Sequence, residues 1–225
     1  MHMPLEDTLG LNLLAANDHQ ADHNREHFDA WRLLCLNVMS SPGAGKTSLL
    51  EQTLTALSAD LAMAVLEGDM TTQLDAERLE AVGVPVIPIT TGRACHLDAA
   101  MVSGGLSLLQ QRLDPASLDL LWVENVGNLV CPTAFDLGED LRIAVLSVTE
   151  GEDKPLKYPA LFKTADAVVI NKTDLAAAVA FERDSALANL RTVAPQAQLF
   201  ELSARTGDGL GALQSWILGQ LVACR

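Results

Sequence analysis

The chain has 225 residues, of which 49% are hydrophobic and only 4% aromatic, and its formal net charge is −14. This length suits one α/β domain with a core of aliphatic side chains. A surface of that charge would repel nucleic acid and anionic membranes, so we exclude both as partners. The charge fits cation handling, a basic protein partner or an ordinary soluble acidic protein. No secretory leader and no apolar run of membrane-spanning length is found, which predicts a cytoplasmic protein.

From residue 33 onward, short apolar runs alternate with helical patterns. We expect residues 1–32 to form an N-terminal helical extension, with a helix near Asp18–Trp31, and residues 33–225 to form one domain. The expected strands are Leu33–Met39, Ala62–Leu66, Val84–Ile89, Leu118–Val126, Ile143–Val148, Ala167–Ile170 and Gln198–Leu202. The expected helices cover Leu50–Leu61, Ala76–Val82, His96–Leu113 and Leu210–Leu221. This alternation predicts an α/β fold with a mostly parallel central sheet flanked by helices.

The segment Ser40–Ser48 has the pattern of a phosphate-binding loop, because it follows an expected strand and opens an expected helix. Its small residues let backbone amides curl around a polyphosphate. Lys46 can reach the β- and γ-phosphates, and the Thr47 hydroxyl can ligate Mg²⁺. Ser40 stands where the usual pattern has its first Gly, and a chance glycine-rich turn is the alternative. The predicted nucleotide-binding residues of this loop are Gly43, Ala44, Gly45, Lys46, Thr47 and Ser48.

The segment Asn171–Asp174 directly follows the expected strand Ala167–Ile170 and has the pattern of a guanine-binding motif. The Asp174 carboxylate can accept protons from guanine N1 and N2, and adenine offers no matching pair. Alone, this segment could be a surface turn. A phosphate loop precedes it and Ser203-Ala204 follows it, where a backbone amide could bind the guanine O6. The predicted guanine-binding residues are Asn171, Lys172, Asp174, Ser203 and Ala204.

Three other residues, Cys95, His96 and Cys131, could form a metal site of sulfur and imidazole ligands. Such ligands suit Zn²⁺ or Ni²⁺, and three of them leave a coordination position open. The spacing alone is a weak signal, because Cys95 and Cys131 could equally be buried small apolar residues. We give that structural interpretation to Cys35 and Cys224. None of the cysteine spacings indicates a disulfide scaffold.

Glu124 lies near the end of the expected strand Leu118–Val126, where a P-loop NTPase places its metal-sensing acid and its second switch. Cys131 is seven residues further along the chain. A nucleotide-driven movement of this loop would therefore also move a thiol. A minimal GTPase needs neither this cysteine nor the Cys95-His96 pair.

Together these motifs resemble the HypB family, GTPases that assist nickel insertion into [NiFe] hydrogenase and belong to the SIMIBI class of dimerising P-loop GTPases. The resemblance runs from about Leu14 to the C-terminus. Its most specific part is the run Glu124–Pro132. The segments that carry it are Asn17-Asp18, Ser40–Thr47, Glu67–Asp69, Cys95–Leu97, Glu124–Pro132, Glu150–Pro159, Asn171–Asp174 and Ser203–Gly207.

The resemblance implies a homodimer with nucleotide-linked assembly and a Ni²⁺ or Zn²⁺ site at the subunit interface, with Cys95, His96 and Cys131 as ligands. It also implies that Lys154 reaches the guanine bound by the other subunit. From the residues alone, Lys154 could equally be a local salt-bridge partner. The implied partners are other hydrogenase-maturation proteins, including a nickel-binding partner and the hydrogenase large subunit.

The resemblance further implies that Asp69 and Glu124 organise Mg²⁺ or the attacking water, with Asp75 a weaker candidate. Lys46, Thr47, Asp69 and Glu124 are thus the expected catalytic residues. No arginine finger is evident, so we expect slow conversion of GTP to GDP. The expected mechanism is that GTP and Mg²⁺ order the switches and set the metal geometry. Hydrolysis would then shift Cys131, lower the metal affinity and pass nickel to a partner.

Some family members carry an N-terminal cysteine motif or a long histidine-rich stretch, and this chain has neither. It has His19, His23 and His27 at positions that would share one helix face. Two such histidines can chelate a metal. A solvated polar face is the more common outcome and is the interpretation we favour.

Three rival functions share some of these motifs. The urease nickel-insertion GTPases of the UreG family separate their Cys and His by a Pro, whereas Cys95 and His96 are adjacent here. A P-loop kinase or ATPase with structural cysteines fits the segment Asn171–Asp174 poorly. The third rival is a non-catalytic scaffold in which bound GTP only holds a dimer together.

Overall fold

The computed structural model describes residues 5–224. Seven strands form one sheet in the order β3-β2-β4-β1-β5-β6-β7, and every ladder between them is parallel. This confirms the predicted α/β class. The strands are β1 Leu34–Ser40, β2 Met63–Asp69, β3 Val86–Thr90, β4 Leu120–Glu124, β5 Leu141–Ser147, β6 Ala167–Asn171 and β7 Gln198–Glu201.

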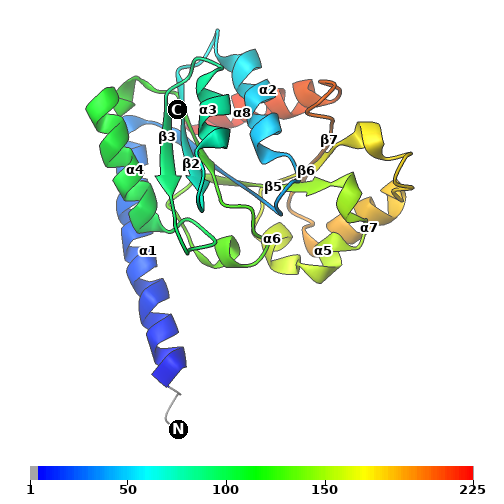
Figure 1. The fold of residues 1–225 in the computed structure, drawn as a ribbon, viewed down its shortest axis with the longest axis horizontal. Coiled ribbons are helices and arrows are strands. Elements are labelled where there is room, and N and C mark those ends of the chain that lie inside the picture. The colour runs from blue at the N-terminus through cyan, green and yellow to red at the C-terminus, as the bar shows by residue number, and fades with distance from the viewer. Residues whose placement is uncertain (1–4, 225) are drawn as a thin grey trace.

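Helices cover both faces of the sheet (Figure 1). The α-helices are α1 Leu5–Trp31, α2 Lys46–Leu57, α3 Leu74–Glu80, α4 Ala99–Arg112, α5 Lys154–Lys157, α6 Pro159–Lys163, α7 Arg183–Val193 and α8 Leu210–Cys224. Four short 3₁₀ turns are η1 Pro115–Ser117, η2 Cys131–Ala134, η3 Val148–Glu150 and η4 Thr173–Leu175. None of the helices in this part of the chain is long and apolar enough to cross a membrane.

The strands are apolar on both faces because both are covered. On one face α2, α3 and α8 pack through aliphatic side chains such as Leu54, Leu79 and Ile217. On the other face Phe28 of α1 and Leu106 of α4 cover β1, β2 and β4. The helices α6 and α7 cover β5 and β6 on the same side as α1 and α4. Parallel strands buried on both sides are the expected result of such helical crossovers.

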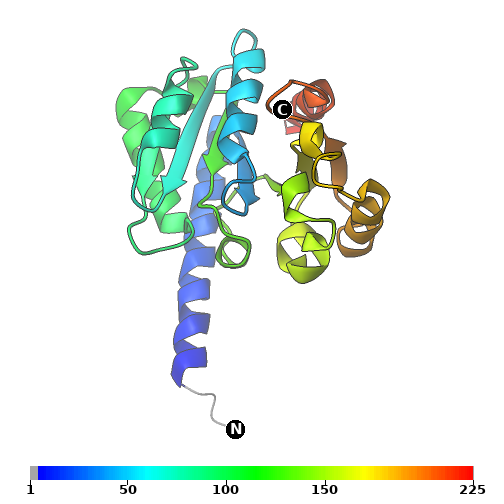
Figure 2. The ribbon, with the colours of Figure 1, turned by 45° about the vertical axis from the view of Figure 1, so that its right-hand side comes forward.

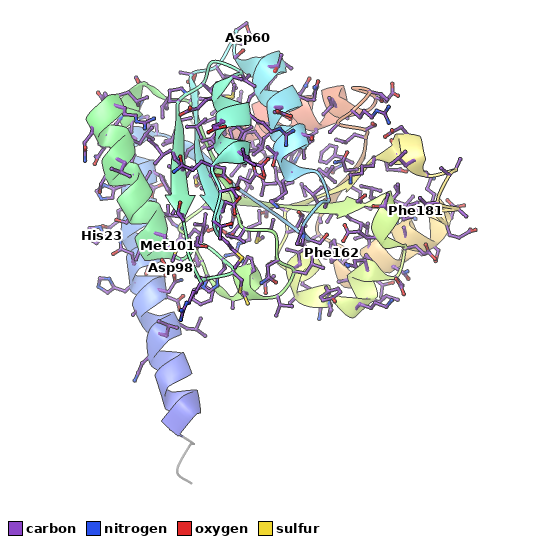
Figure 3. The ribbon with its side chains drawn as sticks, viewed as in Figure 1. His23, Asp60, Asp98, Met101, Phe162 and Phe181 are labelled. Carbon is purple, nitrogen blue, oxygen red and sulfur yellow. The ribbon has the colours of Figure 1, made fainter. Side chains whose placement is uncertain are left out.

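All five expected helices are present with shifted bounds, and α5, α6 and α7 were not expected. Two of the shifts are large or bear on a predicted site. The helix predicted from His96 begins at Ala99, because the Asp98 side chain accepts a 2.8 Å hydrogen bond from the Met101 amide and caps it (Figure 3). Cys95 and His96 therefore lie in the preceding loop. The helix expected near Asp18–Trp31 extends back to Leu5, and its amino-terminal part projects beyond the domain (Figures 1 and 2). The division of the chain at residue 32 stays a prediction, and residues 1–4 lie outside the described part.

Candidate functional site

A cleft of about 570 Å³ lies at the carboxyl ends of β1, β2 and β4. Ligands bind at this edge in open α/β sheets. The cleft combines the phosphate loop with acids from two neighbouring strands. Its lining residues are Pro42, Gly43, Gly45–Ser48, Glu67–Thr71, Asp75, Arg78, Glu124–Gly127 and Lys172.

The phosphate loop connects β1 to α2, as the sequence predicts. Gly45 precedes α2 and offers no side-chain cap, so the first amides of the helix can face an anion. Lys46 is buried, and its Nζ donates a 3.3 Å hydrogen bond to Ser40 Oγ. The serine that replaces the usual glycine thus contacts the loop lysine directly.

Acidic side chains from β2 and β4 line the cleft beside Thr47. The Thr47 hydroxyl donates a 2.7 Å hydrogen bond to Glu124 Oε1. The second carboxylate oxygen of Glu124 and that of Glu67 are buried without a hydrogen-bond partner. Burial raises the pKa of Glu124 to about 7, and burial together with the nearby Glu124 raises the pKa of Glu67 to about 8. Deprotonated, these oxygens form a site that suits a hard cation such as Mg²⁺.

Glu67 is a functional candidate to which the sequence analysis gave no role, although the segment Glu67–Asp69 is part of the family resemblance. Carboxylate oxygens of Glu67, Asp69 and Asp75 lie within 4.8 Å of one another. Asp75 also pairs at 2.9 Å with Arg78, whose guanidinium is bound to Glu51 at 2.6 Å. The available signal was the position of Glu67 directly after an apolar run, two residues before Asp69.

The guanine-type motif at the end of β6 packs against the phosphate loop. Asn171 Nδ2 donates to the Ala44 carbonyl at 3.0 Å, and Lys172 Nζ donates to the Gly43 carbonyl at 2.6 Å. The Ala204 amide donates to Asn171 Oδ1 at 3.0 Å. That amide therefore bonds within the motif, and the contact of a Ser203-Ala204 backbone amide with guanine O6 stays a prediction.

Asp174, the expected guanine-binding acid, lies in η4 just after Lys172 and does not line the cleft described above. Its Oδ1 accepts a 2.6 Å hydrogen bond from the Ser203 hydroxyl, and Arg205 lies 3.9 Å from its other oxygen. Ser203 is fully buried, whereas Arg205 is largely exposed. Ser203 thus fixes the orientation of the carboxylate and leaves its second oxygen near solvent.

The structure brings Cys95, His96 and Cys131 together, as predicted. One ligand atom from each lies within 4.8 Å of the others, and all three residues are half-buried. His96 Nδ1 is buried without a hydrogen-bond partner, and its ring stacks on Phe135 at a centroid distance of 4.0 Å. Burial lowers the pKa of His96, which favours the neutral imidazole that binds metals. An orphaned nitrogen beside two sulfurs fits a Ni²⁺ or Zn²⁺ ion.

We call Cys95, His96 and Cys131 the sulfur–imidazole cluster. Asn128 links the segment that carries Cys95 and His96 to the segment that carries Cys131. Its Nδ2 donates to the Cys95 carbonyl at 3.3 Å, and its Oδ1 accepts from the Val130 amide at 2.9 Å. The thiol of Cys131 has a raised pKa, chiefly because of a hydrogen bond with Cys95. Asn128 was not predicted, although it lies inside the specific run Glu124–Pro132.

A short covalent segment joins the cleft to the cluster. Asn125, 1% exposed, follows Glu124 and accepts a 3.1 Å hydrogen bond from the Leu97 amide, next to His96. Its Nδ2 donates to Asn37 Oδ1 of β1 at 3.3 Å. Two residues later, Gly127 lies so close to Pro42 that an added Cβ would meet Pro42 Cα at 2.9 Å. A movement of the phosphate loop at Pro42 would therefore push against Gly127, which lies in the segment that leads to Cys131.

Lys154 forms the local ion pair that we considered as an alternative. Its Nζ lies 3.3 Å from Glu150 Oε1 and 5.0 Å from the ring centroid of Tyr158. Glu150 also accepts a hydrogen bond from the Ser41 hydroxyl of the phosphate loop. The expected contact of Lys154 with a second subunit stays a prediction.

Of the other described histidines and cysteines, none belongs to the groups of possible metal ligands in the two sites. His23 and His27 are exposed on one face of α1 and stack at 5.6 Å, and His27 stacks on Trp31 at 5.2 Å (His23 is labelled in Figure 3). Cys35 is a buried residue of β1, in agreement with a structural role. The side chain of Cys224 lies outside the described part of the chain.

Comparison with known proteins places these motifs in context. A family model described as the CobW/HypB/UreG nucleotide-binding domain matches residues 34–201. The chain is 50% identical over 206 residues to the hydrogenase maturation factor HypB of Azotobacter vinelandii, covering 92% of this chain and 67% of that protein. The crystal structure of HypB from Helicobacter pylori in complex with nickel matches with a TM-score of 0.88 and 39% identity, covering 92% of this chain and 96% of that one. HypB from Archaeoglobus fulgidus matches with a TM-score of 0.85 and 37% identity, covering 92% and 99%.

Proposed function

Because the chain belongs to the CobW/HypB/UreG nucleotide-binding family, and within it to the HypB hydrogenase maturation factors, we propose that it is a GTP-hydrolysing nickel chaperone. It binds Ni²⁺ at Cys95, His96 and Cys131 and delivers it during [NiFe]-hydrogenase maturation. The similarity to a HypB solved in complex with nickel supports Ni²⁺ over Zn²⁺ as the cargo. GTP hydrolysis triggers the release of nickel from this site.

The observation that carries this proposal is the connection through Glu124 and Asn125. Glu124 accepts the Thr47 hydrogen bond in the nucleotide cleft, and the next residue accepts one from the Leu97 amide beside the cluster. A change at the Thr47 hydroxyl on nucleotide binding would therefore move Asn125, whose side-chain oxygen accepts the hydrogen bond from the Leu97 amide beside His96. Coupling through contiguous packed and hydrogen-bonded groups of this kind is a physical basis for linked binding.

The chemistry of hydrolysis rests on charge and positioning. Lys46 and the first amides of α2 stabilise negative charge that develops on the phosphates. Thr47, Asp69 and Glu124 would hold Mg²⁺, and the orphaned oxygen of Glu67 adds a further donor. When bound, Mg²⁺ would neutralise charge on the β- and γ-phosphates. Arg78 is tied to Glu51 and Asp75, so slow turnover is expected.

Assembly as a homodimer with GTP completes the proposal. Val130, beside Cys131, and Leu156, close to Lys154, are large apolar side chains with exposed fractions of 60% and 51%. Exposed apolar side chains next to functional residues favour an interface there. Lys154 would then leave Glu150 and reach the guanine of the other subunit. A nickel-binding maturation protein would be the donor, and the hydrogenase large subunit the final acceptor.

The test is a nickel titration of wild-type protein and two variants, each with Mg²⁺ and either GDP or a non-hydrolysable GTP analogue. The wild-type nickel affinity should differ by roughly tenfold between the two states, a typical coupling strength. Cys131→Ala should lose the site and keep nucleotide binding. Asn125→Ala should keep both sites and lose the difference between states. Sedimentation of the same samples measures the dimer, and Lys46→Ala supplies the background for GTP turnover.

Three results would each overturn one part of the proposal. Equal wild-type nickel affinities in the GDP and GTP-analogue states would overturn the coupling. Unchanged nickel binding by Cys131→Ala would place the cargo elsewhere. Turnover of wild-type protein no faster than that of Lys46→Ala would overturn the hydrolysis step.

A further inference from the structure

Two asparagines of α1 each bridge the two segments that carry the cluster ligands. Asn17 Oδ1 accepts a 2.9 Å hydrogen bond from the Ala99 amide, and its Nδ2 donates to the Asp136 carbonyl at 2.8 Å. Ala99 comes three residues after His96, and Asp136 comes five residues after Cys131. One side chain thus spans both halves of the site.

Asn24, two turns further along the same helix, repeats this arrangement. Its Nδ2 donates to the Ala99 carbonyl and to the Leu137 carbonyl, both at 2.9 Å. Asn24 is 0% exposed, so water does not compete for these bonds. A buried amide whose two protons both bond to backbone carbonyls is a strongly ordered contact.

The backbone of the 136–139 loop also fits closely against α1. Gly138 has φ +89°, and an added Cβ would meet the Ala21 carbonyl oxygen at 2.5 Å. Asp136 pairs with Arg25 at 2.9 Å. The loop that follows Cys131 is therefore held by α1 through packing, an ion pair and two asparagine bridges.

We propose that Asn17 and Asn24 are positioning residues of the sulfur–imidazole cluster, and that α1 acts as the brace that keeps Cys131 within ligand distance of Cys95 and His96. As a statement about nickel affinity, this rests on the proposed function. Residues that support the metal ligands through hydrogen bonds fix the orientation of those ligands, and their loss typically weakens metal binding about 10- to 100-fold. Asn128 joins the same two segments next to the ligands, at the Cys95 carbonyl and the Val130 amide, whereas α1 holds them further along the chain.

The experiment uses matched Asn→Asp changes, which preserve size and remove the donors. Asn17→Asp keeps an acceptor for the Ala99 amide and loses the bond to Asp136. Asn24→Asp loses both of its bonds. Asn189→Asp is the control, because Asn189 Nδ2 donates to the Glu152 carbonyl at 2.9 Å, outside this arrangement. Thermal unfolding of all variants reports their global stability.

Two readouts report cluster geometry in the full-length chain. Phenylarsine oxide condenses with two thiols to form two As–S bonds and releases water, so its affinity measures the proximity of Cys95 and Cys131 without nickel. Nickel titration, followed by thiolate-to-nickel charge-transfer absorption, measures the complete site. We expect Asn17→Asp to weaken both affinities roughly tenfold and to shift the absorption band. Asn189→Asp should leave both readouts unchanged, and Cys131→Ala sets the background.

The outcomes separate this inference from the proposed function. If wild-type protein binds no nickel but Asn17→Asp still weakens arsenical binding, the brace stands and the nickel function fails. If Asn17→Asp binds arsenical and nickel as wild-type protein does, with the same band, the brace is wrong. An equal loss in Asn189→Asp would also overturn it, since the effect would then be a general result of destabilisation. Should Asn24→Asp fail to fold, Asn17→Asp decides alone.

Discussion

The Thr47 hydroxyl donates a 2.7 Å hydrogen bond to the carboxylate of Glu124. The pair links the start of α2 to the end of β4. Glu124 is only 3% exposed, so the hydrogen bond is shielded from water. In P-loop enzymes the hydroxyl at this position turns to a metal ion when nucleotide binds. Glu124 would then lose its hydrogen-bond donor and become free to orient a water molecule. Under the proposed mechanism, this contact is where nucleotide binding would first act on β4.

Glu124→Gln is expected to bind GDP normally and to slow GTP turnover by roughly 100-fold, in line with the loss of a well-placed acid–base or charge-stabilising group. Glutamine has nearly the same size and still accepts the Thr47 hydrogen bond, but it carries no charge. Single-turnover hydrolysis measures the effect. Glu182→Gln, at an exposed position, is the control. Turnover of Glu124→Gln within twofold of wild type would exclude Glu124 from the reaction.

Gly127→Ala should disturb the phosphate loop, because the added Cβ would meet Pro42 Cα at 2.9 Å and neither backbone can yield cheaply. We expect weaker GDP binding, by roughly tenfold, since overpacking of this kind costs about 1–3 kcal/mol. Isothermal titration with GDP measures the loss. Gly104→Ala in α4 is the matched control, because its Cβ would meet nothing within 4 Å. Its helix should gain roughly 0.5–1 kcal/mol of stability. Normal GDP affinity in Gly127→Ala would contradict the close contact.

The fold was predictable because its signals are local. Strands such as β6 consist mostly of a continuous apolar run, here Ala167–Ile170, and a parallel sheet covered on both faces requires such runs. The start of α4 was wrongly predicted because the helical pattern was extended back to His96. The capping residue Asp98 before an apolar segment was the signal for the true start at Ala99.

The candidate site was predictable only where its residues are contiguous or chemically distinctive. The phosphate loop and Asn171–Asp174 are short motifs, and cysteines attract attention as metal ligands. The residues that hold the cluster are asparagines whose partners lie far along the chain. Asn17 and Asp136 are 119 residues apart, and Asn24 and Ala99 are 75 apart. No spacing rule connects such pairs before the fold is known.

Asp174→Asn is expected to change the base preference of the cleft. If the carboxylate accepts two guanine protons as proposed, each hydrogen bond to the charged group contributes about 1.5–3 kcal/mol. The amide of the variant side chain would instead donate to an oxygen, which xanthine carries where guanine has its amino group. GDP affinity should therefore fall roughly 100-fold or more, while affinity for xanthosine diphosphate rises. Competition titrations with GDP, XDP and ADP check this, and ADP binding at wild-type GDP strength would refute guanine specificity.

The two buried acids Glu67 and Glu124 are expected to make stability depend on pH when metal and nucleotide are absent. The pKa of Glu67 is raised from 4.5 to about 8 and that of Glu124 from 4.5 to about 7, in both cases mainly by burial. Between pH 4.5 and 8 the folded chain therefore binds more protons than the unfolded chain. The free energy of unfolding is then highest below pH 4.5, as far as these groups are concerned, and falls as pH rises through this window.

Glu67→Gln removes the larger of these two contributions, because glutamine stays neutral at every pH. We expect its Tm to fall less than that of wild-type protein between about pH 5 and 8, and to exceed the wild-type Tm at about pH 8. Thermal unfolding in a chelating buffer without nucleotide measures this. Glu77→Gln, an exposed residue of α3, should follow the wild-type profile. Parallel Tm profiles for Glu67→Gln and wild type would mean that Glu67 is already ionised in the folded chain, held by a positive charge such as that of Lys46.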